Sequence, residues 1–154
     1  MLQAIRMILF VGVCFFSTGL VKAQYPEAKR SLVSEYLADP VAQRSSIWWD
    51  ALGRELALAI DVPHTAADDD VIKYIIFFAT NHHEKVMLND AADRLLDIYN
   101  NHPDEGLRMM SVAALYAIGD TESMKDLQVH VAGDASRRVR HIASAAVYSF
   151  NAEH

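Results

Sequence analysis

Apolar residues recur with a period of about 3.6 through most of the chain after residue 28, which is the pattern of amphipathic helices with one buried face. The clearest stripe runs along 137–150 and consists of Val139, Ile142, Ala143, Ala146, Val147 and Phe150. The same pattern predicts a weak helix over 29–38 and further helices over 41–60, 71–80, 86–100, 107–118 and 124–131. Proline or glycine residues fall between most of these segments and favour short connections. The pattern therefore predicts an all-α fold of about seven helices.

The strong helix predicted over 41–60 has one apolar stripe and two additional apolar neighbours. The stripe consists of Trp48, Leu52, Leu56 and Ala59, and Trp49 and Ile60 widen it. Adjacent helix positions differ by about 100°, so we expect at least one of the two tryptophans to pack into the core. The other tryptophan then lies at the edge of the buried face.

Segment 71–80 (VIKYIIFFAT) is apolar nearly all round. A helix of this kind belongs in the middle of a structure, covered on both sides. Its β-branched and aromatic residues also permit a strand, but no other segment offers a pairing partner, so the helix is favoured. Asp68, Asp69 and Asp70 precede it, and their carboxylates suit the positive end of a helix dipole. They lack the alternating ligand spacing of a calcium loop.

The first 23 residues have the layout of a secretory signal peptide. Arg6 precedes an uncharged run over 7–21, and Val21-Lys22-Ala23 places small residues where a signal peptidase cleaves. The run is short for a membrane-spanning helix, although an uncleaved anchor remains the alternative. We therefore divide the chain into a signal peptide (1–23), an N-terminal segment with a weak helix (24–40) and a helical domain (41–154). The protein is expected to be extracytoplasmic, either periplasmic or secreted.

Composition narrows the function classes. The chain has 154 residues, 52% of them hydrophobic, and a net charge of −6. These values exclude a disordered chain and argue against nucleic-acid binding. Cleavage after Ala23 removes Arg6 and Lys22, so the mature chain, Gln24 to His154, carries a net charge of −8. The sole cysteine, Cys14, is lost with the signal, so no disulfide or thiolate site is expected. We also expect no stable membrane insertion after cleavage.

Two helices repeat each other at a constant offset, which is the separation between Arg108 and Arg140. Segment 108–118 (RMMSVAALYAI) aligns with 140–150 (RHIASAAVYSF), and an acidic residue precedes each arginine. A third, degraded copy is expected to start at Asp70, with Lys73 in the position of Arg108. Helical units of this length are typical of solenoids.

Residues 104–150 resemble the HEAT-repeat family, including its short bacterial form. The resemblance rests on Leu107-Arg108, Ala113-Ala114-Leu115, Gly119-Asp120, Leu127, Asp134, Val139-Arg140 and Ala145-Ala146-Val147. It implies a short α-solenoid of antiparallel helix pairs that binds another protein or peptide along a face of stacked helices. The paired alanines are expected to let neighbouring helices approach, and acidic residues and arginines at the repeat junction are expected to pair along the stack.

No catalytic motif places the potentially reactive residues together. The sequence lacks a nucleophile elbow, a glycine-rich phosphate loop and paired catalytic carboxylates, so we predict neither an enzyme nor a cofactor. All seven histidines lie in the mature chain, without a recognised metal-ligand spacing. The alternative to an interaction protein is therefore a periplasmic histidine-based metal or small-ligand binder, whose most testable ligands are His82 and His83.

Two features are candidate partner-binding sites. Arg137, Arg138 and Arg140 form the only basic cluster, at the start of a predicted helix, and suit an acidic partner. Arg140 also fits the junction position of the repeat, which leaves Arg137 and Arg138 for binding. The pair Trp48-Trp49 could supply an aromatic contact, and Trp49 is the candidate there. The predicted function is an exported, non-enzymatic protein–protein interaction module.

Overall fold

The computed structural model describes residues 31–60 and 68–153. Its helices are α1 (Leu32–Ala38), α2 (Ser46–Ala59), α3 (Asp68–His82), α4 (Asn89–Asn101), α5 (Glu105–Ile118), α6 (Thr121–His130), the short 3₁₀ helix η1 (Val131–Gly133) and α7 (Arg137–Glu153). No strand occurs within these two ranges, so the all-α prediction is confirmed and 71–80 is helical. The predicted signal peptide, 1–23, lies outside the described residues. None of the described helices is long and apolar enough to cross a membrane.

Side chains that accept hydrogen bonds from backbone amides set where several helices begin. Ser45 caps α2, which therefore starts at Ser46 rather than near Val41 as the apolar pattern suggested. Asp104 caps α5, and Asp120 caps α6 ahead of the predicted start. Gly119 ends α5 with a φ of 72°, a left-handed conformation that glycine adopts without a Cβ clash.

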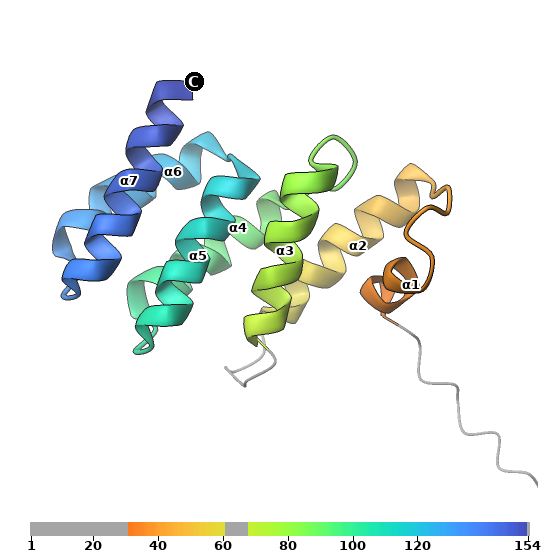
Figure 1. The fold of residues 1–154 in the computed structure, drawn as a ribbon, viewed down its shortest axis with the longest axis horizontal. Helices are drawn as coiled ribbons and strands as arrows, with labels where there is room; N and C mark the ends of the chain where they lie inside the picture. Colours follow the sequence, from red (N-terminus) through yellow and green to blue (C-terminus); the bar gives the residue numbers. More distant parts are fainter. Residues whose placement is uncertain (1–30, 61–67, 154) are drawn as a thin grey trace, which may run out of the picture.

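The helices lie in two rows (Figure 1). In one row α3 contacts α5 and α5 contacts α7, while in the other α2 contacts α4 and α4 contacts α6. Contacts between the rows join α2 to α3, α4 to α5, and α6 to α7. The stack thus consists of three layers, each with one helix from each row. Helix α1 lies at the opposite side of the stack from α7 and packs on α2.

The buried face of α2 is rotated toward Trp49, although two residues of the predicted stripe stay buried. Trp49, Leu52 and Leu56 are buried, whereas Trp48 and Ala59 are only partly buried. The rotation brings Gly53 against the loop that joins α3 to α4. A Cβ atom at Gly53 would lie 2.1 Å from the carbonyl oxygen of Met87, so only glycine permits this approach.

Helix α3 is covered on one side rather than on both. Ile72, Ile75 and Phe78 are fully buried, but Phe77 is 40% exposed. The expectation of cover on both sides is wrong because the neighbours of α3, which are α1, α2 and α5, leave its outer side to solvent. The three aspartates that precede 71–80 form the first turn of α3, near the positive end of its dipole.

The sequence repeat is visible in the burial of α5 and α7. Ser111 and its counterpart Ala143 are both fully buried, as are the corresponding Leu127 of α6 and Leu95 of α4. Of the paired alanines, Ala114 is fully buried and Ala146 is partly buried against the core, whereas Ala113 and Ala145 are exposed. Their helix positions point away from the neighbouring row.

The proposed third copy is out of register. Lys73, aligned with Arg108, is exposed and bonds to Asp70 within its own helix, at 3.1 Å. Shifting the alignment by one position places the buried Ile75 on Ser111 and the buried Ala79 on Leu115. The relation between α3 and α5 is therefore one of packing position, without the junction arginine.

Candidate interaction surface

The junction between the second and third layers centres on Arg108. Its Nη1 donates to the carbonyl oxygen of His102 at 2.9 Å, and its Nη2 donates to Oδ1 of Asp134 at 3.2 Å. The side chains of Arg108 and Asp134 are only 13% and 7% exposed. The expected pairing along the stack is therefore present, and it is a buried ion pair rather than a solvent-screened one.

The same arrangement recurs one repeat later, with one member absent. Arg140 Nη1 donates to the carbonyl oxygen of Asp134, as Arg108 does to that of His102. Ser136 caps the start of α7 through Val139, as Asp104 caps α5 through Leu107. In the part of the chain that the structure describes, no carboxylate pairs with Arg140.

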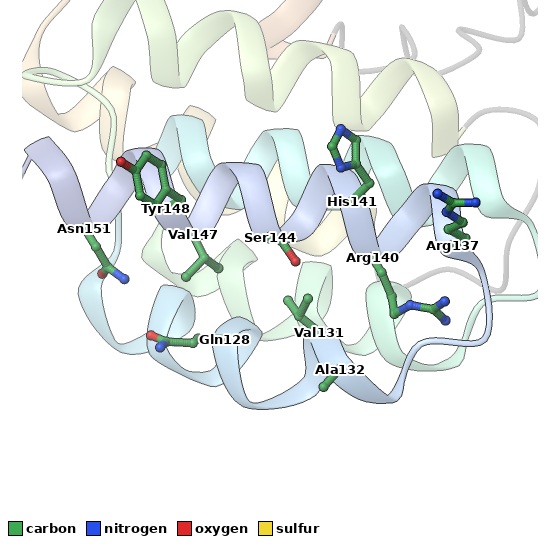
Figure 2. A pocket seen from close by; sticks show the side chains of 10 residues that line it. All are labelled: Gln128, Val131, Ala132, Arg137, Arg140, His141, Ser144, Val147, Tyr148 and Asn151. Carbon is green, nitrogen blue, oxygen red and sulfur yellow. The ribbon is translucent and has the colours of Figure 1, made fainter.

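A groove of about 720 Å³ lies between α7 and the α6–η1 segment (Figure 2). Its cationic part is formed by Arg137, Arg140 and His141. The remainder of the lining consists of Gln128, Val131, Ala132, Ser144, Val147, Tyr148 and Asn151. The groove thus combines an apolar floor with hydrogen-bonding groups and a positive end, on a chain whose net charge is −6.

Arg137 and Tyr148 are two exposed functional groups of this groove. Arg137 is exposed at the start of α7, and Tyr148 is 78% exposed three turns further along the helix. Arg138 is also exposed, but it does not line the groove. Sequence reasoning found Arg137 and missed Tyr148. The signal for Tyr148 was its alignment with Tyr116 in the repeat.

Trp49 lies in an aromatic cluster beneath α1. It is 6% exposed, and its ring lies 4.9 Å from His82 and 6.1 Å from Tyr36, measured between centroids. Packing therefore accounts for Trp49. The accessible ring of the pair is Trp48, whose indole N–H donates to Glu35 and whose face is covered by the Arg44 guanidinium at 4.6 Å.

His82 joins α3 to α1 through this cluster. Its Nε2 lies 2.7 Å from the Tyr36 hydroxyl. Burial, with the nearby charges of Lys85 and Arg44, lowers the pKa of His82. The hydrogen bond between the Tyr36 hydroxyl and the His82 imidazole therefore ties α1 to α3.

The histidines with described surroundings are spread over the molecule. His102 Nδ1 accepts from the Asp104 amide, His130 Nδ1 bonds to the Asp126 carbonyl, and His83 is exposed beside Glu84. Within 31–60 and 68–153, no three histidine, aspartate or glutamate side chains come together as metal ligands. The metal-binding alternative gains no support from these residues.

A second, more polar pocket of about 470 Å³ lies beside the Arg108 junction. It is lined by Tyr99, Asn100, Asn101, His130, Gly133 and Asp134. Burial and the charge of Asp134 raise the pKa of the Tyr99 hydroxyl, and Arg108 partly opposes them. The neutral phenol belongs to the packing between α4 and α6.

Comparison with known proteins gives no relative for this chain. No family model, curated protein or solved structure matches it.

Proposed function

We propose that the protein is an exported, non-enzymatic interaction module that binds a segment of another protein in the α6–α7 groove. Its architecture is interpreted as a short HEAT-like α-solenoid of antiparallel helix pairs. The observation that carries the proposal is the groove itself, about 720 Å³ in volume, with guanidinium groups at one end and an apolar floor. Pockets of this mixed lining suit a peptide with an apolar face and acidic residues.

The chemistry of the groove supports binding over catalysis. Arg137, Arg140 and His141 offer charge and hydrogen bonds, and in the described structure no hydrogen bond joins the Ser144 hydroxyl to the His141 imidazole as a nucleophile–base pair requires. Guanidinium groups recognise carboxylates through paired hydrogen bonds, which gives specificity without any bond being broken. The partner is therefore a protein or peptide segment with carboxylate groups.

Export is part of the proposal and rests on residues 1–23. We expect the protein isolated from its host to begin at Gln24 and to be found outside the cytoplasm. N-terminal sequencing of the purified protein checks this, and retention of Met1 on a membrane-bound form would contradict it.

Site-specific photocrosslinking in the native host tests the groove. A photoreactive residue at Gln128, which lines the groove, should capture a discrete partner. The same residue at Asp93, exposed on α4, is the matched control and should not capture that partner. Equal products from both positions, or none from Gln128, would rule out the groove as the binding site.

A further inference from the structure

The face of α5 that α7 covers is a guide to the chemistry that the uncovered face of α7 would bind. On α5, Arg108 bonds to Asp134 ahead of α7 and Tyr116 bonds to Glu153 of α7, and Val112 lies one turn from each on the same side of the helix. Their counterparts one repeat later, Arg140, Ser144 and Tyr148, all line the groove. Figure 2 shows these three side chains along α7, with Val131 of η1 below. The groove therefore occupies the position that the next layer would fill.

The other row, which contains α4 and α6, shows the same correspondence between a covered and an uncovered face. Leu96 and Tyr99 of α4 are buried, and Tyr99 lies beside His130 and Gly133 of the next layer. Their counterparts at the same offset are Gln128 and Val131, which form the other wall of the groove. Polar residues replace two of the buried apolar ones, Val112 by Ser144 and Leu96 by Gln128. These exchanges keep the outer face compatible with water when nothing covers it.

Two carboxylates secure α7 on the covered face. Asp134 accepts from Arg108 Nη2 at 3.2 Å, and Glu153 accepts from the Tyr116 hydroxyl at 2.9 Å. The hydrogen bond to Glu153 is also the largest cause of a raised pKa at Tyr116. The corresponding groups on α7 are Arg140 and Tyr148, and among the described residues neither has a carboxylate partner.

We propose that the groove binds an acidic helical segment of a partner protein, which stacks on α7 as α7 stacks on α5. One carboxylate of the segment pairs with Arg140 and a second accepts from the Tyr148 hydroxyl. Arg140 and Tyr148 are separated by about 12 Å along the helix, which sets the spacing of the two carboxylates. The inference rests on the proposed function and specifies the partner's chemistry.

The occupant is a different protein rather than a second copy of this chain. The two carboxylates that make these contacts within the chain, Asp134 and Glu153, are already engaged with Arg108 and Tyr116. Asp134 is also buried at 7% exposure. A second copy could offer them only by breaking its own junction between layers.

A designed peptide tests the proposal with the purified protein. The probe is a fluorescein-labelled amphipathic helix of about 16 residues with an alanine–leucine background. It carries two glutamates at the same separation as Arg140 and Tyr148, and the matched probe carries glutamine at both positions. We expect the glutamate peptide to bind at least about tenfold more tightly by fluorescence anisotropy, and to weaken more between about 50 and 500 mM salt.

Two variants locate the contacts. Tyr148→Phe removes only an exposed hydroxyl, and should weaken the glutamate peptide about tenfold while leaving the glutamine peptide unchanged. Lys125→Gln removes a charge on the exposed side of α6, outside the groove lining, and should change neither affinity by more than about twofold. Thermal melting followed by circular dichroism verifies that both variants remain folded.

Equal affinities for the two peptides, or a glutamate peptide that binds Tyr148→Phe as well as the original protein, would overturn the inference. Self-association of the protein that Tyr148→Phe abolishes would replace the proposed partner by a second copy. If the peptides fail but crosslinking at Gln128 still captures a partner, the acidic-helix inference fails and the proposed function stands. If both fail, the proposed function falls as well.

Discussion

The α1 side and the α7 side of the stack treat aromatic residues in opposite ways. Beneath α1, the ring of Tyr36 contacts Trp49, Phe78 and His82, and Tyr36 is 6% exposed. On α7, Tyr148 is 78% exposed above a groove. The short helix α1 is thus sufficient to cover one side of the stack, whereas the other side presents its hydrogen-bonding groups to solvent.

The difference separates the side that we expect to stabilise the fold from the side that we propose to bind a partner. The α1 side buries its rings and satisfies the Tyr36 hydroxyl through His82 at 2.7 Å. The α7 side repeats the junction geometry of the layer before it, but no carboxylate among the described residues pairs with Arg140. We expect substitutions on the α1 side to unfold the protein, and substitutions on the α7 side to change what it binds.

Tyr36 on the α1 side and Tyr148 on the α7 side should show the largest difference in stability on substitution. Tyr36→Ala should lower the free energy of unfolding by about 3–5 kcal/mol, because it empties an aromatic cluster and removes a hydrogen bond. Tyr148→Ala should lower it by less than about 0.5 kcal/mol. Urea denaturation followed by circular dichroism measures both, and similar losses would remove the distinction between the two sides.

The two junction arginines sharpen the contrast within the repeat. Arg108→Ala should cost about 3 kcal/mol, because it leaves the Asp134 carboxylate buried without its cation. Arg140→Ala removes a bond to one backbone carbonyl and should cost about 1 kcal/mol. The same denaturation experiment compares them. A larger loss of unfolding free energy for Arg140→Ala than for Arg108→Ala would mean that Arg140 already has a buried partner.

Acidification should lower the free energy of unfolding through His82, and this is the smallest of the effects that we predict. The pKa of His82 is lowered in the folded protein, so the folded state binds fewer protons than the unfolded state near pH 6. Its contribution to stability is present above the unfolded pKa of about 6.5 and is lost as pH falls toward the folded value. The urea concentration at the unfolding midpoint should therefore decrease when the pH is lowered from 7.5 to 5.5.

Two histidine variants isolate this effect. His82→Gln should reduce the change in midpoint between the two pH values, whereas His141→Gln, on the exposed side of α7, should preserve it. If the His82 variant retains the full pH dependence, other groups titrate in that window and the expected contribution of His82 is wrong.

Local signals in the sequence predicted the helices and several of their ends. Gly119 acts through its own backbone, so the predicted end of α5 at residue 118 is correct, whereas the caps Asp104 and Asp120 start α5 and α6 earlier than the apolar pattern predicted. The orientation of α2 was less accessible. Trp48 and Trp49 are equally apolar, and only the packing of α1 and α3 decides which ring is buried.

The groove could not be predicted from the repeat alone. Tyr116 and Tyr148 occupy equivalent positions, yet one bonds to Glu153 and the other is exposed. The difference arises from whether another layer lies beside them, which the periodicity does not state. A faint signal was present in the exchange of Val112 for Ser144, since a polar residue at a buried repeat position indicates exposure there.

The junction at Arg108 has a consequence for how such a molecule can change in length. Each layer is held by contacts to the layer just before it, and the arginine–carbonyl bond and the helix cap recur in the following unit. Duplicating one such unit would add a layer and move the groove outward without disturbing the existing layers. Growth by whole units, rather than by loop insertion, is therefore the evolutionary route that this geometry leaves open.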